Sequence, residues 1–166
     1  MDPLENLTNL LGEEIENLKG LLLLCEEEKK SLVAEDIHSL NRENRAQEEL
    51  ISRLREVERA REKVTEEIGK SLGLPGEGFS LSELLPHLAE PYSTRLKQMG
   101  DRLRQYLERI KSINRTNALL LANSLRIIQK KVSFLTKIGE GDDTLYCQEG
   151  RISPRGVKRR IVDRRA

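Results

Sequence analysis

A ladder of residues spaced alternately four and three positions apart limits the possible folds more than any other feature of the chain. Its members are Tyr92, Leu96, Met99, Leu103, Tyr106, Ile110, Ile113, Asn117, Leu120, Ser124, Ile127, Lys131, Phe134 and Ile138. The spacing keeps all of them on one face of an α-helix and repeats every seven residues, as the seam of a coiled coil does. The pattern predicts one long helix that packs against other helices, and it predicts burial of Leu103, Tyr106, Ile110 and Ile113.

The ladder changes in character from Asn117 onward. Three of its positions become polar, and a second apolar row starts one residue later, at Ala118. The two apolar rows and the polar stripe between them span roughly 200° of the helix surface at about 100° per residue. Contact with one neighbouring helix needs an apolar stripe of only about 100°, so the surplus predicts a binding partner. The predicted partner-binding residues are Asn117, Ala118, Leu121, Ser124, Leu125, Ile128, Val132 and Leu135, with Asn117 and Ser124 supplying hydrogen bonds at the edge.

The composition is that of a helical protein without a large core. Ala, Glu, Lys, Leu and Arg make up about half of the 166 residues, a bias that together with heptad spacing is typical of long helices and coiled coils. Only five residues are aromatic, so the core is predicted to be a thin aliphatic seam. The predicted fold is all-α: an elongated antiparallel helical bundle with coiled-coil-like packing, a long C-terminal helix and a disordered basic tail.

The boundaries of the predicted helices follow from capping residues and helix breakers. Four helices are predicted, over residues 3–34, 36–72, 80–90 and 91–138. Asp2 followed by Pro3 is a helix start, because Asp caps free N–H groups and Pro fits the first helical position. Asp36 is the predicted cap of the second helix.

Glycine, proline and serine mark the later boundaries. Gly73 is predicted to end the second helix in the left-handed conformation, ahead of Pro75. Ser80 and Glu83 have the spacing of a capping box, in which each side chain bonds the other residue's backbone N–H. Gly139 and Gly141 are predicted to end the last helix.

The end of the chain differs in charge from the rest. Residues 151–166 carry a net charge of +6, so the rest of the chain carries −5. We predict one helical domain over residues 1–138 and a flexible basic tail over 139–166, which is polar and has no sustained apolar period. The tail has no interleaved aromatic residues to stack on bases, so nucleic acid is not expected as a partner. Membrane contact would be transient and made through the tail.

Neither a membrane span nor a signal peptide is predicted. The longest fully apolar runs fall far short of the roughly 20 residues that cross a bilayer. The first residues lack the basic start and apolar core of a signal peptide. We therefore expect a cytoplasmic protein.

The residues that usually carry catalysis or hold cofactors are few and scattered. The only histidines are His38 and His87, and the only cysteines are Cys25 and Cys147. They do not have the spacing of a zinc site, and Cys25 lies on an apolar stripe that predicts a buried packing role. We expect no enzyme activity, no cofactor, no metal and no small-molecule substrate.

Three segments resemble one known family. They are Leu32-Val33-Ala34-Glu35-Asp36, the block from Ile113 to Leu121, and Leu125-Arg126-Ile127-Ile128. Together with the order of the predicted helices, they resemble the FlgN family of flagellar export chaperones over about residues 4–146. Thr144-Leu145-Tyr146 also resembles the family's short tail, although Cys147 stands where Gly is more usual.

The resemblance implies a cytoplasmic, non-enzymatic chaperone of the type III flagellar export apparatus. Its clients would be the hook–filament junction proteins (hook-associated proteins), whose C-terminal helical segments it would bind and keep unassembled until export. Components of the export apparatus are further candidate partners. A groove on the last helix would cover the client's assembly helices, in a helix-in-groove mode of recognition.

Two other functions also fit the sequence. A homodimeric coiled-coil scaffold would use the surplus apolar face for self-association, and Asn44 on a helical seam could fix its register. A binder of nucleic acid or membrane surfaces would depend on residues 151–166 alone. A stop at Gly73 followed by a capped short helix favours a chain that folds back on itself over an extended parallel dimer.

Overall fold

The structure, a computed structural model, describes the backbone of residues 2–141 and the side chains of residues 2–136. Its elements in chain order are α1 (Pro3–Ala34), α2 (Ile37–Ser71), α3 (Leu81–Leu84), the 3-10 helix η1 (Leu85–His87) and α4 (Tyr92–Gly141). Every element of this part is a helix, which confirms the predicted all-α class. Residues 142–166 of the predicted tail lie outside the described residues.

The chain divides into two compact units, Met1–Leu121 and Ala122–Ala166, and the boundary falls within α4. The first unit holds α1, α2, α3, η1 and the first part of α4. The described part of the second unit is the remainder of α4. The predicted domain limit between residues 138 and 139 stays a prediction.

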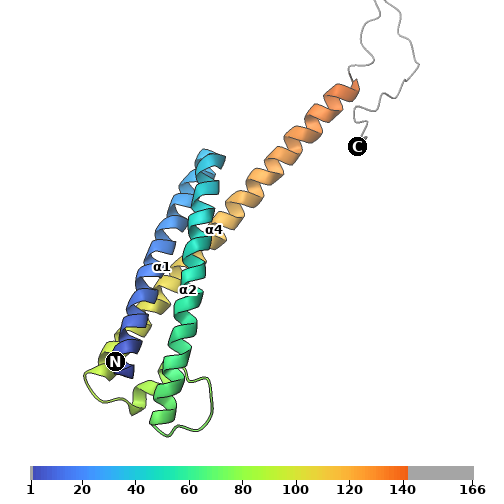
Figure 1. The fold of residues 1–166 in the computed structure, drawn as a ribbon. Coiled ribbons are helices and arrows are strands. Elements are labelled where there is room, and N and C mark those ends of the chain that lie inside the picture. Colours follow the sequence, from blue (N-terminus) through green and yellow to red (C-terminus); the bar gives the residue numbers. More distant parts are fainter. Residues whose placement is uncertain (1, 142–166) are drawn as a thin grey trace, which may run out of the picture. The chain divides into compact units, whose positions relative to one another are not determined.

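α1 and α2 form an antiparallel hairpin joined by Glu35 and Asp36 (Figure 1). Both predicted N-caps are present. The Asp2 carboxylate accepts a hydrogen bond from the Leu4 N–H at 3.1 Å, and the Asp36 carboxylate accepts one from the Ser39 N–H at 3.1 Å. Each cap satisfies a backbone donor that the first turn of a helix leaves free, so the starts of both helices are fixed locally.

The end of α2 has the predicted glycine cap. Gly73 adopts a left-handed conformation with φ 71°, and the Leu74 N–H donates to the Gly69 carbonyl at 3.1 Å. Gly69 also makes room for the loop that follows, because a Cβ atom there would overlap the ring of Phe79. The loop can therefore pack its one phenylalanine directly onto the α2 backbone.

The helix predicted over residues 80–90 is shorter than expected, and the prediction of one continuous helix there was wrong. The capping box is present, with the Ser80 N–H donating to the Glu83 carboxylate at 2.8 Å. However, α3 ends at Leu84 and gives way to η1. Pro86 has no N–H to donate to the carbonyl four residues earlier, so the α-helical hydrogen-bond pattern stops there.

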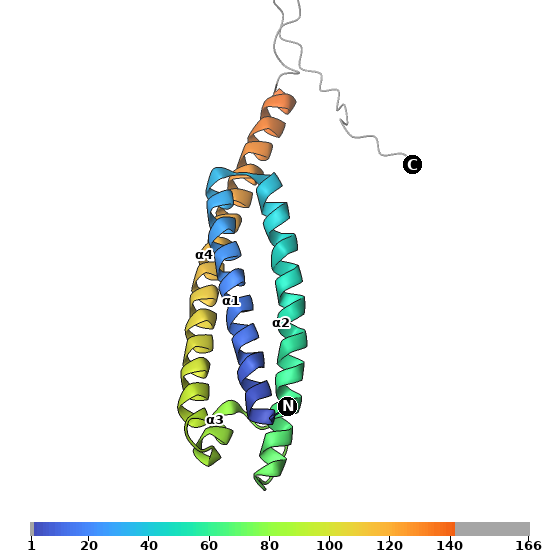
Figure 2. The same cartoon turned by 60° about the vertical axis from the view of Figure 1, so that its left-hand side comes forward.

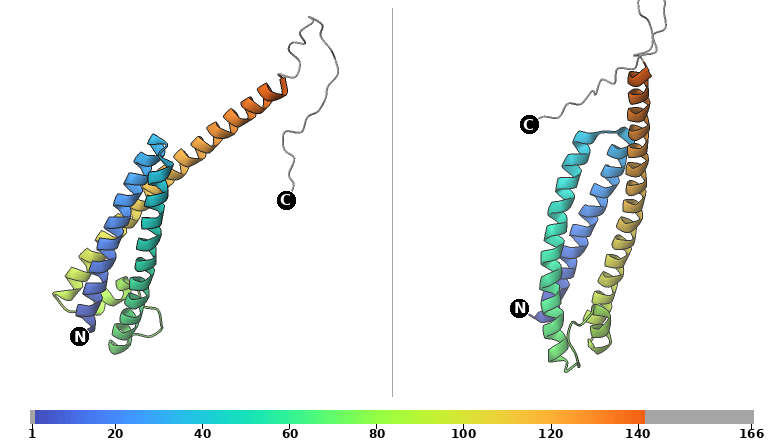
Figure 3. Two further views of the ribbon diagram at one scale, coloured as in Figure 1. Left: turned by 45° about the horizontal axis from the view of Figure 1, so that its top comes forward. Right: turned by 90° about the vertical axis from the view of Figure 1, so that its right-hand side faces the viewer.

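Within the first unit, α4 runs parallel to α1. The Tyr92 hydroxyl donates to the Asp2 carboxylate at 3.2 Å, and further along both helices the Asn117 amide donates to the Cys25 carbonyl at 3.0 Å. Figure 2 and the right-hand view of Figure 3 show α1 lying between α2 and this part of α4. The three helices thus alternate in direction along the chain, up, down and up.

The core consists of two apolar clusters that both include residues of α1. One contains Leu7, Leu11, Val64, Ile68, Phe79, Leu84 and Leu96, and the other contains Leu18, Leu21, Leu22, Cys25 and Ile110. Burial of Cys25 and Ile110 is confirmed. The other three ladder residues predicted to be buried, Leu103, Tyr106 and Ile113, are half-buried against these clusters.

Gly139 does not end α4. The helix continues to Gly141, past the predicted end at residue 138. A glycine inside a helix costs about 1 kcal/mol relative to alanine but keeps its N–H donor, so it does not stop the helix by itself. Gly100 has a packing role, because a Cβ atom there would lie 3.0 Å from Cδ2 of Leu81.

Truncating Ile110 to alanine tests the packing of α4. Ile110 is only 7% exposed and belongs to the second core cluster, so we expect Ile110→Ala to lower the free energy of unfolding by about 2–5 kcal/mol. Leu119→Ala, at a residue of the same helix that is 68% exposed, should change it by no more than about 0.5 kcal/mol. Thermal unfolding monitored by circular dichroism measures both, and equal midpoints for the two variants would contradict the packing.

Candidate binding surface

The part of α4 in the second unit carries six large apolar side chains that are exposed. They are Leu125, Ile127, Ile128, Val132, Phe134 and Leu135, with exposed fractions between 49% and 66%, and we call them the distal apolar face. Single apolar residues on a surface are common, but six at helical spacing on one short segment form a patch of the kind that marks an interaction site.

The distal apolar face consists of two rows. Ile127 and Phe134 continue the ladder, and the other four residues form the second row predicted from the sequence. Ser124, which is half-buried, and Lys131, which is exposed, lie between the rows. The predicted surface did not include Ile127 and Phe134, because the ladder was assigned to packing within the bundle.

Seven of the eight predicted partner-binding residues are at least partly exposed. Ala118 and Leu121 are exposed on the last turns of α4 in the first unit, and Leu121 is 49% exposed. The other five are Ser124, Leu125, Ile128, Val132 and Leu135, all in the second unit. Their contact with a partner stays a prediction.

Asn117 does not belong to this surface, and its placement there was wrong. Its side chain is 4% exposed and donates from Nδ2 to the Cys25 carbonyl at 3.0 Å and to the Glu28 carboxylate at 2.9 Å. Gln47 of α2 donates to the same carboxylate oxygen of Glu28 at 3.1 Å. Residues from all three long helices thus meet in one polar layer. Asn117 fills a ladder position that faces α1, where its amide satisfies buried acceptors.

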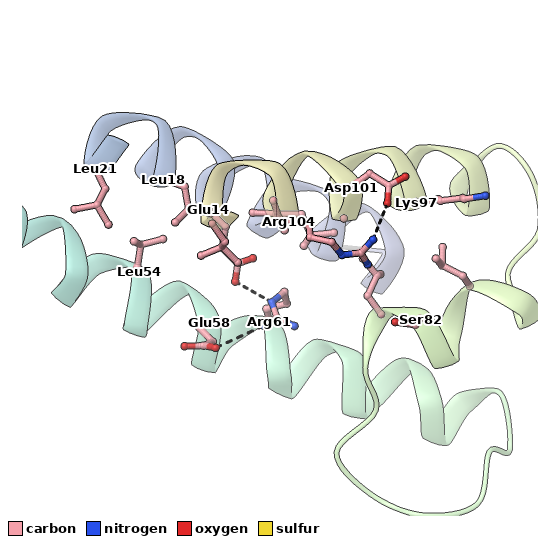
Figure 4. A pocket seen from close by; sticks show the side chains of 16 residues that line it. Glu14, Leu18, Leu21, Leu54, Glu58, Arg61, Ser82, Lys97, Asp101 and Arg104 are labelled. Atoms are coloured by element: carbon pink, nitrogen blue, oxygen red, sulfur yellow. Dashed lines mark hydrogen bonds and ion pairs between the residues drawn. The ribbon is translucent and has the colours of Figure 1, made fainter. Parts of the chain in front are cut away.

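A groove also runs along the bundle of the first unit, between α2 and α4 (Figure 4). Its volume is about 650 Å³, and residues of α1, α3 and η1 complete its walls. The apolar lining residues are Leu11, Leu18, Leu21, Leu54, Leu81, Leu85, Leu103 and Leu107. Sequence reasoning missed the groove because its residues come from five elements and share no spacing along the chain.

The charges in the groove are largely paired with one another. Arg61 donates to the Glu14 carboxylate at 2.8 Å and also lies 3.9 Å from Glu58, while Arg104 and Asp101 are 3.4 Å apart on α4. Figure 4 shows the Glu14–Arg61 pair bridging α1 and α2. Burial raises the pKa of the Glu14 carboxyl, and the nearby Arg61 guanidinium offsets part of that rise. The pair therefore has a structural role in joining two helices.

The comparison with protein families decides what kind of chain this is. The model of the family described as FlgN protein matches residues 1–154. The chain belongs to the FlgN family. This is a family of flagellar export chaperones, in agreement with the resemblance noted in the sequence. Comparison with curated proteins and with solved structures gave no match.

Both histidines and Cys25 of this FlgN chain lie within its described part. His38 and His87 are both exposed. Burial and the nearby Glu28 and Glu26 raise the pKa of the Cys25 thiol to about 11, so it stays protonated at neutral pH. Between residues 2 and 141 no group of three or more potential metal ligands lies together, and no helix is long and apolar enough to span a bilayer.

Removing Arg61 tests the structural role of the Glu14–Arg61 pair. In Arg61→Met the buried Glu14 carboxylate, only 9% exposed, loses its cation, and we expect a loss of about 3 kcal/mol at neutral pH. The pKa of Glu14 is already raised by burial, and it should rise further without Arg61. Protonated Glu14 needs no cation, so the deficit relative to wild type should shrink as the pH falls through this raised pKa.

Urea unfolding between neutral and mildly acidic pH measures this deficit. The matched control is the double variant Glu14→Gln/Arg61→Met, which has no ionisable group at either position. Its stability relative to wild type should lack the pH dependence of the single variant. A deficit in Arg61→Met that stayed constant with pH would show that lost packing of the Arg61 stem, and not the uncompensated carboxylate, causes the destabilisation.

Proposed function

We propose that this FlgN-family chaperone binds the C-terminal helical segments of hook–filament junction proteins and keeps them unassembled in the cytoplasm until export. The observation that carries the proposal is the distal apolar face. Its six apolar side chains are about half to two-thirds exposed, and covering them would remove their surface from water at a gain of about 25 cal/mol per Å². Membership of a family of flagellar export chaperones supports the same role.

The physical task of such a chaperone explains why an apolar helix face suits it. Segments that assemble as helices expose an apolar stripe when they are alone, and the same stripe drives premature association. A partner helix that presents a complementary apolar stripe covers it by the helix-in-groove mode. Because the chaperone must later release its client, an open face on one helix suits the function better than an enclosed pocket.

The homodimeric scaffold is the main alternative, since two copies could cover the distal apolar face of each other. The hairpin of α1 and α2 folds back on itself, and α4 packs on α1 within one chain. The N-terminal helices therefore do not need a second copy to bury their apolar stripes. The alternative that depends on residues 151–166 concerns a part of the chain outside the described residues.

Copurification from a flagellated host, followed by identification of the partners and measurement of stoichiometry, tests the proposal. We expect a complex with a hook–filament junction protein that contains one copy of each chain. The complex should be lost when the C-terminal segment of the client is deleted. Recovery of only self-associated chaperone would favour the scaffold instead.

A charge placed on the distal apolar face should abolish client binding without unfolding the chaperone. Leu125→Asp and Ile128→Asp each put a carboxylate where an apolar contact is predicted, and these residues are 51% and 55% exposed in the free chain. Burying an unpaired carboxylate against a client is strongly unfavourable. We expect the copurified complex to disappear while helicity and the thermal midpoint stay close to wild type.

The matched control is Ser133→Asp, because Ser133 is exposed and lies on the opposite side of the same helix segment. This variant carries the same added charge and should retain the client. If Leu125→Asp unfolded the free protein, its side chain would belong to the chaperone's own core. If Ser133→Asp lost the client as well, the added charge and not its position would be responsible.

A further inference from the structure

The second half of α4 is rich in basic residues. Between Glu108 and Glu140 the sequence contains seven Lys or Arg residues and no Asp or Glu. In the second unit, the basic residues whose side chains the structure describes are Arg126, Lys130 and Lys131, and all three are exposed. None of them takes part in an ion pair among the described side chains, residues 2–136.

The other long helices have a different charge pattern. α2 alternates acidic and basic residues, and pairs such as Glu66 with Lys70, 3.0 Å apart, neutralise one another along its surface. Residues 1–121 together carry a net charge of −5. The positive charge of α4 in the second unit is therefore not a general property of the chain. It occurs on the same stretch of helix as the distal apolar face.

Lys131 occupies the centre of this face. It is three or four residues from Ile127, Ile128, Phe134 and Leu135, the positions that neighbour it on a helix surface. A partner that covers the two apolar rows must also cover the Lys131 ammonium between them. Covering an ammonium ion without a counter-charge is costly, so a suitable partner brings an anionic group to this point.

We infer that the distal apolar face and its cations bind an acidic amphipathic helix of a second protein, whose carboxylates meet Lys131 between the apolar rows and Lys130 beside the row of Ile127 and Phe134. Arg126 lies seven residues before Ser133 and therefore on the opposite side of the helix. This inference rests on the proposed function and adds to it the charge of the client segment. Apolar contact supplies the affinity, and the match of charges selects acidic helices over basic ones and speeds their association.

A helix fits this surface better than an anionic bilayer does. A basic amphipathic helix on a membrane keeps its cations on the polar side and buries an uninterrupted apolar face in the lipid. Here Lys131 and the half-buried Ser124 lie between the two apolar rows. A protein helix can place a carboxylate opposite Lys131 and still contact both rows, whereas hydrocarbon cannot satisfy either polar group.

The test uses the full chain and two synthetic helical peptides of about 20 residues, long enough to form a helix when bound. Both peptides have the same leucine positions, and their polar positions carry Glu in one and Lys in the other. We expect the Glu peptide to bind at least about tenfold more tightly at low salt, since each of its two opposite-charge pairs contributes about 0.5 kcal/mol and each like-charge pair of the Lys peptide costs about as much. The preference should weaken as salt screens the charges.

Two double variants with equal net charge locate the effect. Lys130→Glu/Lys131→Glu should lose or reverse the preference for the Glu peptide. Arg59→Glu/Lys63→Glu, at two exposed positions of α2, should keep it. Circular dichroism checks that both variants remain as helical as wild type.

Equal binding of the two peptides, or an equal loss of preference in both variants, overturns the inference. Vesicles of phosphatidylcholine with phosphatidylglycerol provide a further arm. If the α4 variant loses vesicle binding but keeps the peptide preference, the cations serve a lipid surface and the inference is wrong.

Binding of junction-protein segments with no charge preference would overturn this inference and leave the proposed function standing. A preference for the Glu peptide without any binding of junction-protein segments would overturn the proposed function and leave the charge preference of this surface standing.

Discussion

The bundle depends on the burial of the apolar face of α1 between α2 and α4. Both core clusters include residues of α1, with Leu7 and Leu11 in one and Leu18 and Cys25 in the other. With so few aromatic residues, no other apolar surface could form a larger core. The apolar stripe of α1 is wide enough to contact a helix on each side. Every change that loosens the packing of α4 therefore also exposes apolar surface of α1.

Polar contacts give this aliphatic seam its register. Leucines can slide past one another with little loss of contact, but a buried amide or carboxylate that loses its partner costs free energy. Glu28 receives hydrogen bonds from Asn117 of α4 and Gln47 of α2, and Glu14 pairs with Arg61. These contacts hold the three helices at defined positions along their length, in the way that a buried Asn fixes the register of a coiled coil.

The packing of the bundle and the proposed binding function share one helix. Up to Asn117, ladder residues of α4 contact α1 within the bundle. From Leu125 to Leu135, the residues of both rows are exposed, and every charged residue of this stretch is basic. A helix with this composition can recognise a partner through apolar contact and charge without any enclosed site. That agrees with membership of a family of flagellar export chaperones.

The sequence by itself determined the helical class, the caps at Asp2, Asp36 and Ser80, and the presence of a surplus apolar face on α4. These features depend on neighbours within about one or two helical turns, so spacing alone predicts them. Only the tertiary structure decided that Asn117 is buried, that Arg61 reaches Glu14 on another helix, and that a groove separates α2 from α4. Those outcomes depend on which helices pack together and in what register. Packing between residues that are many helical turns apart in the chain decides both.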